Sequence, residues 1–295
     1  MRCANFSTQT FRFKKMNDKR YRTRVAPTTS GLLHIGHART FLTACARARE
    51  RNGVVVLRID DIDFDRCTPQ YEAAAIADMK SAGVFWDEGG ELGGKFAPYR
   101  QSERLDFYES ALKKLIGGGF VYPSYASRSQ IRQAAALPAR RFDFCDAEPI
   151  FPPQMRPTTP PSQSEIENLR TVNWRFRVPD GMRVDFFDNA SGEHSFVCGE
   201  DFGDFLVWRK SGAPSYELAS SVDDALMEIT EIVRGEDLLL STARQILIWN
   251  ALALPVPEFY HCPLLLDEDG KKLSKTSMRK SGESKWLIRA RTDSK

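Results

Sequence analysis

The sequence has no long apolar run, no Cys-x-x-Cys pair, no internal repeat and no strong excess of either charge. A membrane-spanning helix needs about 20 consecutive apolar residues, so we expect a soluble chain. The six cysteines are scattered and no secretory signal is visible, which predicts reduced thiols, a cytoplasmic location and no zinc cluster. Lys and Arg number 42 against 39 Asp and Glu, a balance that permits an RNA partner without indicating one.

The length of 295 residues, 42% of them apolar, predicts one large domain with an insertion or two domains. Residues 1–20 are basic and lack apolar periodicity, which predicts a disordered extension or a start assigned too early, with a second methionine at Met16. The scarcity of acidic residues there leaves an organelle-targeting segment as a weaker alternative.

Residues 24–40 predict a strand, a loop and a helix in succession. A β-prone run ends at Ala26, Pro27 and the following Thr-Thr-Ser-Gly break it, and a helical pattern runs from about Leu32 toward Arg51. The first turn of a helix attracts phosphate, because it has unpaired N–H groups and the positive end of the dipole. This unit therefore suits a nucleotide.

His34 and His37 lie three residues apart, on one helical face, and each can donate an imidazole N–H to phosphate. Gly36 between them lets a flat base or ribose approach the backbone. Two such histidines alone are more often ordinary surface or core residues. A Gly-opened, lysine-rich loop at 269–276, after a strand-like run at 260–266, would by itself be a solvated charge run, but the pair of elements is far more specific.

Together the two elements resemble the signature pair of class I aminoacyl-tRNA synthetases of the glutamyl branch. The resemblance rests on Arg-Val-Ala-Pro-Thr-Thr-Ser-Gly before His-Ile-Gly-His, and on Lys-Leu-Ser-Lys-Thr at 272–276. It extends over residues 22–276 through Leu-Arg-Ile-Asp-Asp-Ile-Asp at 57–63, Tyr-Arg-Gln-Ser-Glu-Arg at 99–104, Ser-Val-Asp-Asp at 221–224 and Glu-Ile-Val-Arg-Gly-Glu-Asp-Leu at 231–238.

A β-branched run at 54–59 follows the first helix and predicts a right-handed βαβ crossover. We therefore predict an α/β fold: a Rossmann-type doubly wound parallel sheet with an inserted, smaller α+β subdomain, and ligands at the carboxyl ends of the strands. Residues 21–97 and 196–295 would form the catalytic domain, with the lysine loop at 271–276. Prolines gather between 149 and 161, which places the inserted acceptor-like subdomain at 98–195.

Other elements are predicted from capping residues and apolar patterns. Thr68-Pro69 caps a helix over 71–82, and a second helix over 101–116 stops at three glycines. Strands are expected over 171–178, 205–209 and 229–234, and a helix over 242–252. Asp60, Asp61 and Asp63 lie at a strand end, where crowded carboxylates suit a cation or amine, although a solvated strand end is equally compatible.

The resemblance implies activation of L-glutamate by ATP with Mg²⁺. The implied catalytic residues are His34, His37, Lys272 and Lys275, the lysines supplying mobile ammonium groups to the triphosphate. The implied ATP-binding residues are Pro27, Thr28, Gly31, His34, Gly36, His37, Lys272, Ser274 and Lys275. The implied glutamate-binding residues are Arg24, Val25, Ala26, Pro27, Thr28, Asp60, Tyr216 and Arg234, with the two guanidiniums on the side-chain carboxylate.

The sequence departs from the family at two places. Short relatives often hold zinc through a Cys-x-Cys, a Tyr and a Cys, but the matching positions here are Ser124, Ala126, Phe151 and Met155, so we predict no zinc. Asp60 stands where the family has an amine-binding glutamate. Because its side chain is one methylene shorter, we expect weaker glutamate binding, with a bridging water as one remedy.

Only a short basic stretch follows Thr276, so the chain resembles the glutamyl-Q tRNA(Asp) synthetases, which attach glutamate to the queuosine base of tRNA(Asp). The expected partners are L-glutamate, ATP and that tRNA, with no membrane and a monomeric state. Candidate RNA contacts are Arg128, Arg132, Arg140 and Arg141. Alternatives are the catalytic core of a glutamyl-tRNA synthetase and a non-catalytic RNA-binding paralogue. A cytidylyltransferase shares the His-x-Gly-His element, but would not explain the two arginines with Tyr216.

Overall fold

The structure, a computed structural model, describes residues 20–135 and 149–264. The helices are α1 (Ile35–Glu50), α2 (Pro69–Ser81), α3 (Leu105–Gly117), α4 (Arg128–Ala134), α5 (Gln163–Glu167), α6 (Tyr216–Leu226) and α7 (Leu239–Ala251). The strands are β1 (Arg22–Val25), β2 (Val54–Leu57), β3 (Glu88–Gly89), β4 (Val121–Ser124), β5 (Asn173–Phe176), β6 (Arg183–Asp188), β7 (Gly192–Val197), β8 (Phe205–Trp208), β9 (Glu231–Gly235) and β10 (Glu258–Cys262).

The N-terminal half contains the predicted parallel crossover. Strands β1 and β2 pair in parallel, in register from Arg22 with Val54 to Val25 with Leu57, and α1 connects them. Strand β3 adds to the other edge of β2, also in parallel. All four side chains of β2 are buried, as expected for a strand covered on both faces. The first predicted βαβ unit is thus confirmed.

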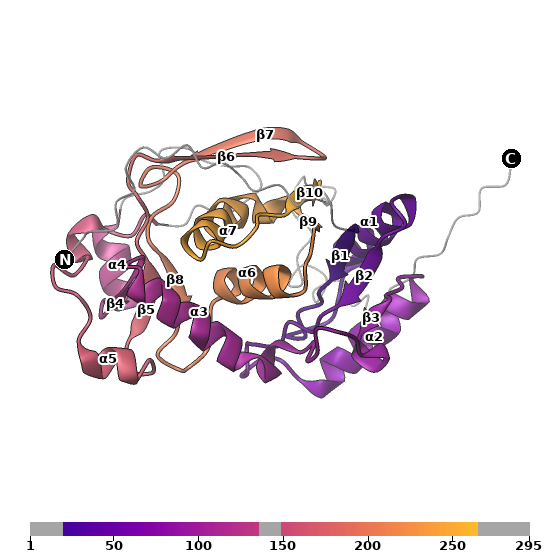
Figure 1. Ribbon diagram of the computed structural model, residues 1–295, viewed down its shortest axis with the longest axis horizontal. Helices are drawn as coiled ribbons and strands as arrows, with labels where there is room; N and C mark the ends of the chain where they lie inside the picture. The colour runs from indigo at the N-terminus through magenta and orange to yellow at the C-terminus, as the bar shows by residue number, and fades with distance from the viewer. Residues whose placement is uncertain (1–19, 136–148, 265–295) are drawn as a thin grey trace, which may run out of the picture.

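The C-terminal half continues this parallel arrangement. Strands β9 and β10 pair in parallel, and the β6–β7 hairpin extends their sheet through β6. Strand β9 lies beside β1, where the Thr230 amide donates to the Arg22 carbonyl at 2.9 Å and Arg24 Nη1 donates to the Val233 carbonyl at 3.0 Å. The carboxyl ends of β1, β2, β9 and β10 therefore lie close together (Figure 1).

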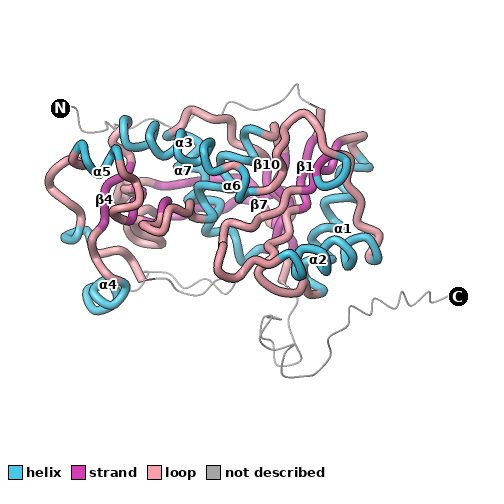
Figure 2. The backbone as a smooth tube through the Cα atoms, turned by 90° about the horizontal axis from the view of Figure 1, so that it is seen from below, coloured by secondary structure: helices cyan, strands magenta, loops and turns pink. Residues whose placement is uncertain are grey.

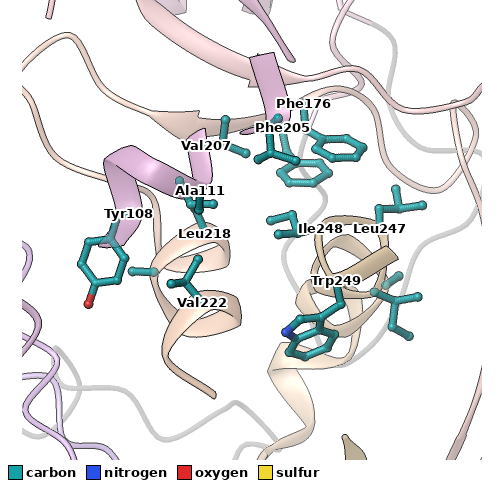
Figure 3. Close-up of a cluster of buried hydrophobic side chains, with 14 of the residues drawn as sticks. Tyr108, Ala111, Phe176, Phe205, Val207, Leu218, Val222, Leu247, Ile248 and Trp249 are labelled. Atoms are coloured by element: carbon teal, nitrogen blue, oxygen red, sulfur yellow. The ribbon is translucent and has the colours of Figure 1, made fainter. Parts of the chain in front are cut away.

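A separate antiparallel sheet, in the order β4-β5-β8, occupies the opposite end of the elongated molecule, near α4 and α5 (Figure 2). A buried apolar cluster joins it to the centre, where Phe176 and Phe205 stack at 5.2 Å over side chains of α3, α6 and α7 (Figure 3). The Trp249 indole N–H donates to the Ser221 carbonyl at 2.9 Å and so ties α7 to α6. The two helices carry this core toward the parallel strands.

The predicted elements exist, but some of their limits differ. The helix expected over 101–116 is divided at Arg104 into a single 3₁₀ turn at Gln101–Glu103 and α3, because this segment packs polar side chains inward. The Thr68 hydroxyl caps α2 as predicted, by accepting from the Tyr71 amide. The predicted domain limits stay a prediction, yet the sheets cross them: β6 and β7 join β10, whereas β8 joins β5.

Within residues 20–135 and 149–264, no helix combines the length and apolar character that crossing a bilayer requires.

Candidate active site

A cavity of about 230 Å³ opens where β1, the start of α1, the start of α6, β9 and the end of β10 converge. Its lining mixes cationic, imidazole and small side chains, which suits an anionic ligand. The lining residues are Arg24, Ala26, Thr28, His34, Gly36, His37, Thr40, Phe41, Asp60, Tyr216, Val233, Arg234, Gly235, Asp237, Leu238, Cys262, Pro263 and Leu264.

The two predicted histidines form one wall of this cavity. His34 is the N-cap of α1: its Nδ1 accepts from the Gly36 amide at 3.1 Å, and His37 Nδ1 accepts in turn from the His34 amide at 3.1 Å. Since each Nδ1 is an acceptor, the proton of each neutral ring is on Nε2, the N–H that the ring can offer to a phosphate. The imidazoles lie 3.9 Å apart between ring centroids and act as a pair.

The helix start differs from the expectation in one respect. The amides of Gly36 and His37 are already paired, with His34 Nδ1 and with the His34 carbonyl. The imidazoles, rather than these amides, are therefore the anion donors at this helix end. Gly36 also has a packing reason, because a Cβ there would lie 2.9 Å from His34 Cε1 and displace the ring.

Arg234 on β9 also lines the cavity, and its hydrogen-bond partners are neutral. Its Nη1 donates to the Tyr216 hydroxyl at 3.1 Å and its Nη2 donates to Thr242 Oγ1 at 2.5 Å. Its Nε donates to His261 Nε2 at 3.1 Å. Burial lowers the pKa of His261 to about 4, so this ring is neutral near pH 7. A buried cation with neutral partners attracts a ligand anion strongly.

Arg24 on β1 also lines the cavity, but its side chain is already paired. Its Nε donates to Asp224 Oδ1 at 3.1 Å, and Arg58 Nη1 donates to the same oxygen at 2.7 Å. Burial alone would raise the pKa of Asp224, but Arg24 and Arg58 lower it below its usual value. Arg24 therefore belongs to an ion-pair cluster whose charges are compensated within the protein.

Asp60 belongs to the same cluster. Arg58 holds both of its oxygens, with Nε to Oδ1 at 2.6 Å and Nη2 to Oδ2 at 3.1 Å. Burial raises the pKa of Asp60 to about 6, against the opposing effect of Arg58. The carboxylate predicted to meet a substrate amine thus lines the cavity while its charge is shared with a guanidinium.

The motif at 99–104 has a structural role that the sequence did not reveal. Asp223 of α6 accepts from Gln101 Nε2 at 2.9 Å, from Arg104 Nε at 2.7 Å and from the Tyr108 hydroxyl at 2.8 Å. Asp61 accepts from the amide and hydroxyl of Ser102, at 2.8 and 2.7 Å. Asp61 and Asp223, each from a family motif, therefore bind the segment at 99–104 to the loop after β2 and to α6.

Most predicted site residues within the described ranges meet at this one cavity. Three do not line it: Val25 and Pro27 are buried, and Gly31 is part of the segment between β1 and α1. Lys272, Ser274 and Lys275 lie outside the described residues, so their role stays a prediction. The sequence indicates no role for Arg58, although it falls in the motif at 57–63. It indicates none for Asp188, Thr242 and His261 either, which fall in none of the family motifs.

The positions that replace the zinc ligands lie in a different kind of cluster. Ser124 ends β4, and Phe151 is buried beneath the Arg175 guanidinium at 4.5 Å. Nearby, Arg156 donates to both oxygens of Asp204 at 2.7 Å. Across residues 20–135 and 149–264, no group of three or more His, Cys, Asp or Glu side chains is arranged to hold a metal. Absence of zinc from the protein stays a prediction.

The predicted RNA contacts are only partly placed. Arg128 and Arg132 are exposed on α4 and do not line the cavity. Arg140 and Arg141 lie outside the described residues. An RNA-binding face is therefore still a prediction.

Comparisons with known proteins show the family of this chain. Residues 20–291 match the family model for the catalytic domain of class I tRNA synthetases (E and Q). The glutamyl-Q tRNA(Asp) synthetase of Symbiobacterium thermophilum is 45% identical over 253 residues, which are 85% of this chain and 77% of that protein. The glutamate–tRNA ligase 2 of Syntrophus aciditrophicus is 41% identical over 88% of this chain and 52% of its own length.

A solved structure has a similar fold. The glutamate tRNA ligase of Elizabethkingia meningosepticum, in complex with its amino acid, superposes with a TM-score of 0.74 at 28% identity. The match covers 90% of this chain and 53% of that one. The chain thus spans about half the length of the ligases that it matches, and the likeness supports a Rossmann-type core.

Proposed function

The chain belongs to the class I aminoacyl-tRNA synthetases of the glutamyl and glutaminyl branch, and we propose that it activates L-glutamate with ATP and transfers it to the queuosine base of tRNA(Asp). The observation that carries the first half is the cavity itself. A buried guanidinium with neutral hydrogen-bond partners and a pair of imidazoles line one cavity of about 230 Å³. The guanidinium suits the carboxylate of an amino acid, and the imidazoles suit phosphate.

In the proposed activation, the α-carboxylate of glutamate attacks the α-phosphate of ATP and pyrophosphate leaves. Negative charge builds on the phosphate oxygens, so fixed donors lower the barrier. His34 and His37 are prepared for this role because the α1 cap orients both rings before a ligand arrives. Lys272 and Lys275 are proposed to add ammonium groups at the triphosphate.

Arg234 is proposed to select glutamate over glutamine. A guanidinium whose protein partners are all neutral gains more from a carboxylate than from an amide. Tyr216 accepts from Arg234, which leaves its own hydroxyl proton to donate to the same carboxylate. Asp60 is proposed to meet the substrate amine from the other side.

The queuosine acceptor has its support in one relative. The Symbiobacterium protein carries that name and this chain spans 77% of it, against 52% of the Syntrophus ligase. The alternative acceptor is tRNA(Glu), which the many glutamate–tRNA ligases among the relatives favour. We prefer the first because its match is longer in proportion and higher in identity.

Two assays test the proposal in sequence. ATP–pyrophosphate exchange, measured with glutamate, glutamine and aspartate in Mg²⁺ buffer without tRNA, should show exchange with glutamate alone. Absence of exchange with every amino acid would favour a non-catalytic RNA-binding paralogue. Transfer of labelled glutamate should then occur to queuosine-containing tRNA(Asp) and not to the same tRNA lacking queuosine. Charging of tRNA(Glu) instead would reassign the acceptor.

A further inference from the structure

A chain of three buried side chains leads away from the cavity behind Arg234. The guanidinium donates through Nε to His261 Nε2 at 3.1 Å, and His261 Nδ1 meets Asp188 Oδ2 at 2.7 Å. Asp188 and His261 are at most 1% exposed, and the three residues come from β6, β9 and β10. None of the sequence motifs includes Asp188 or His261.

The hydrogen-bond directions in this chain are fixed by chemistry. A guanidinium has only N–H donors, so His261 Nε2 must accept and Nδ1 must carry the proton. Asp188 is the matching acceptor and is itself held by the amides of Ala190 and Ser191, each at 3.0 Å from Oδ1. Burial alone would raise the pKa of Asp188, but His261, the Ala190 amide and the Ser191 hydroxyl lower it to about 2. Asp188 is thus ionised and selects one tautomer of His261.

Thr242 completes the support on the same edge of the guanidinium. Its Oγ1 accepts from Arg234 Nη2 at 2.5 Å and lies 3.0 Å from His261 Nε2. With the Nε–Nη2 edge occupied in this way, the remaining N–H bonds at Nη1 and Nη2 are directed toward Tyr216 and the cavity. Arg234 is held in one orientation without losing its charge to a carboxylate.

We propose that Asp188 and His261 are positioning residues, which orient Arg234 for a substrate carboxylate. The imidazole of His261 lies between Arg234 and the Asp188 carboxylate, so that this carboxylate does not compete with the substrate. This inference rests on the proposed function. A carboxylate in direct contact with Arg234 would compete with the substrate, whereas the neutral imidazole passes on orientation and not charge. Asp188 acts on the site only through the ring.

Two substitutions of one residue separate the links of this chain. His261→Asn places an amide near the Nδ1 position, where it can reach Asp188, but offers no acceptor to Arg234. His261→Gln places its carbonyl near the Nε2 position and restores that acceptor. In ATP–pyrophosphate exchange, H261N should raise the KM for glutamate roughly 10- to 100-fold, as expected for loss of a hydrogen bond to a charged group. H261Q should recover most of this loss, and the KM for ATP should change less than about twofold in both.

A second measurement does not depend on glutamate turnover. In ¹⁵N-labelled protein, the wild type should show a neutral Nδ1–H tautomer for His261 at pH 6 and a protected Arg234 Nε–H signal. That arginine signal should persist in H261Q and disappear in H261N. If the wild type fails to use glutamate, the proposed function fails, and these spectra still decide the inference.

Three outcomes would overturn the inference. One is an unchanged KM for glutamate in H261N. Another is equal loss in H261N and H261Q, which would indicate general damage to the fold. The third is an Nε2–H tautomer for His261, because such a ring has no lone pair for Arg234.

Discussion

Two buried arginines line the cavity, Arg234 and Arg24, yet the charges of their hydrogen-bond partners differ. Arg234 is surrounded by a hydroxyl from Tyr216, a hydroxyl from Thr242 and a neutral imidazole. Arg24 shares the carboxylate of Asp224 with Arg58. Residue type and burial are the same, so the difference lies in the hydrogen-bond partners, which include a carboxylate only for Arg24. An anionic group should bind at Arg234.

The ion-pair cluster around Arg24 has a structural function of its own. The guanidiniums of Arg24, Arg58 and Arg104 pair there with the carboxylates of Asp60, Asp223 and Asp224. They join β1, the end of β2, α3 and α6, which come from distant parts of the chain. Removing one partner from such a buried network leaves an opposite charge unpaired, which is costly.

The largest expected effect is therefore on stability, at the ion-pair cluster around Arg24. Arg24→Met should lower the free energy of unfolding by about 3 kcal/mol, because Asp224 loses one of two buried cations. Urea unfolding followed by circular dichroism measures it. Arg234→Met is the matched control and should cost clearly less, since no carboxylate touches Arg234. Equal losses of unfolding free energy in both variants would contradict the distinction between Arg24 and Arg234.

The pH dependence of stability tests the neutral imidazole behind Arg234. The pKa of His261 falls from 6.5 to about 4 on folding, so its contribution is complete above pH 6.5 and is lost as the pH falls through 4. Between these two pH values, the contribution of His261 to the free energy of unfolding changes by on the order of 3 kcal/mol. Unfolding curves of the wild type and H261Q, compared from pH 7.5 to 4, should converge toward acid pH. Parallel curves would show that His261 does not titrate in this way. Asp60, whose raised pKa acts in the opposite sense, is common to both proteins and cancels.

The next largest effect tests whether the planar guanidinium of Arg234 is required. Arg234→Lys keeps the charge but loses the planar fork and the bond to His261, so the KM for glutamate should rise about 10- to 100-fold. Exchange assays with varied glutamate measure it, and Arg183→Lys, at an exposed site on β6, is the control. A KM within twofold of wild type would mean that charge alone, without the fork, binds the substrate.

The smallest expected effect concerns the amine. Asp60→Glu restores the family's longer side chain and should lower the KM for glutamate by a few-fold, about 1 kcal/mol. The gain is limited because Arg58 already holds both carboxylate oxygens of Asp60. An unchanged or raised KM for glutamate would show that Asp60 does not limit binding.

Much of the site followed from local sequence. A strand, a turn-rich loop and a helix over 24–40 could be predicted because capping residues and helical spacing act within a few residues. The family resemblance predicts roles for His34, His37, Tyr216 and Arg234, and all four line one cavity in the structure. The break in the helix at Arg104 does not follow from local periodicity, and Arg104 bonds in the structure to Asp223, a residue far away in the chain.

By itself, the sequence determined the order of elements, the buried parallel strands and the residue types at the cavity, since these depend on local periodicity and on motif composition. Only the tertiary structure decided which arginine is compensated. Charge compensation depends on distances of about 3 Å between side chains from different strands and helices, and no spacing along the chain records them. The support of Arg234 by Asp188 and His261, brought together from β6 and β10, is the clearest instance.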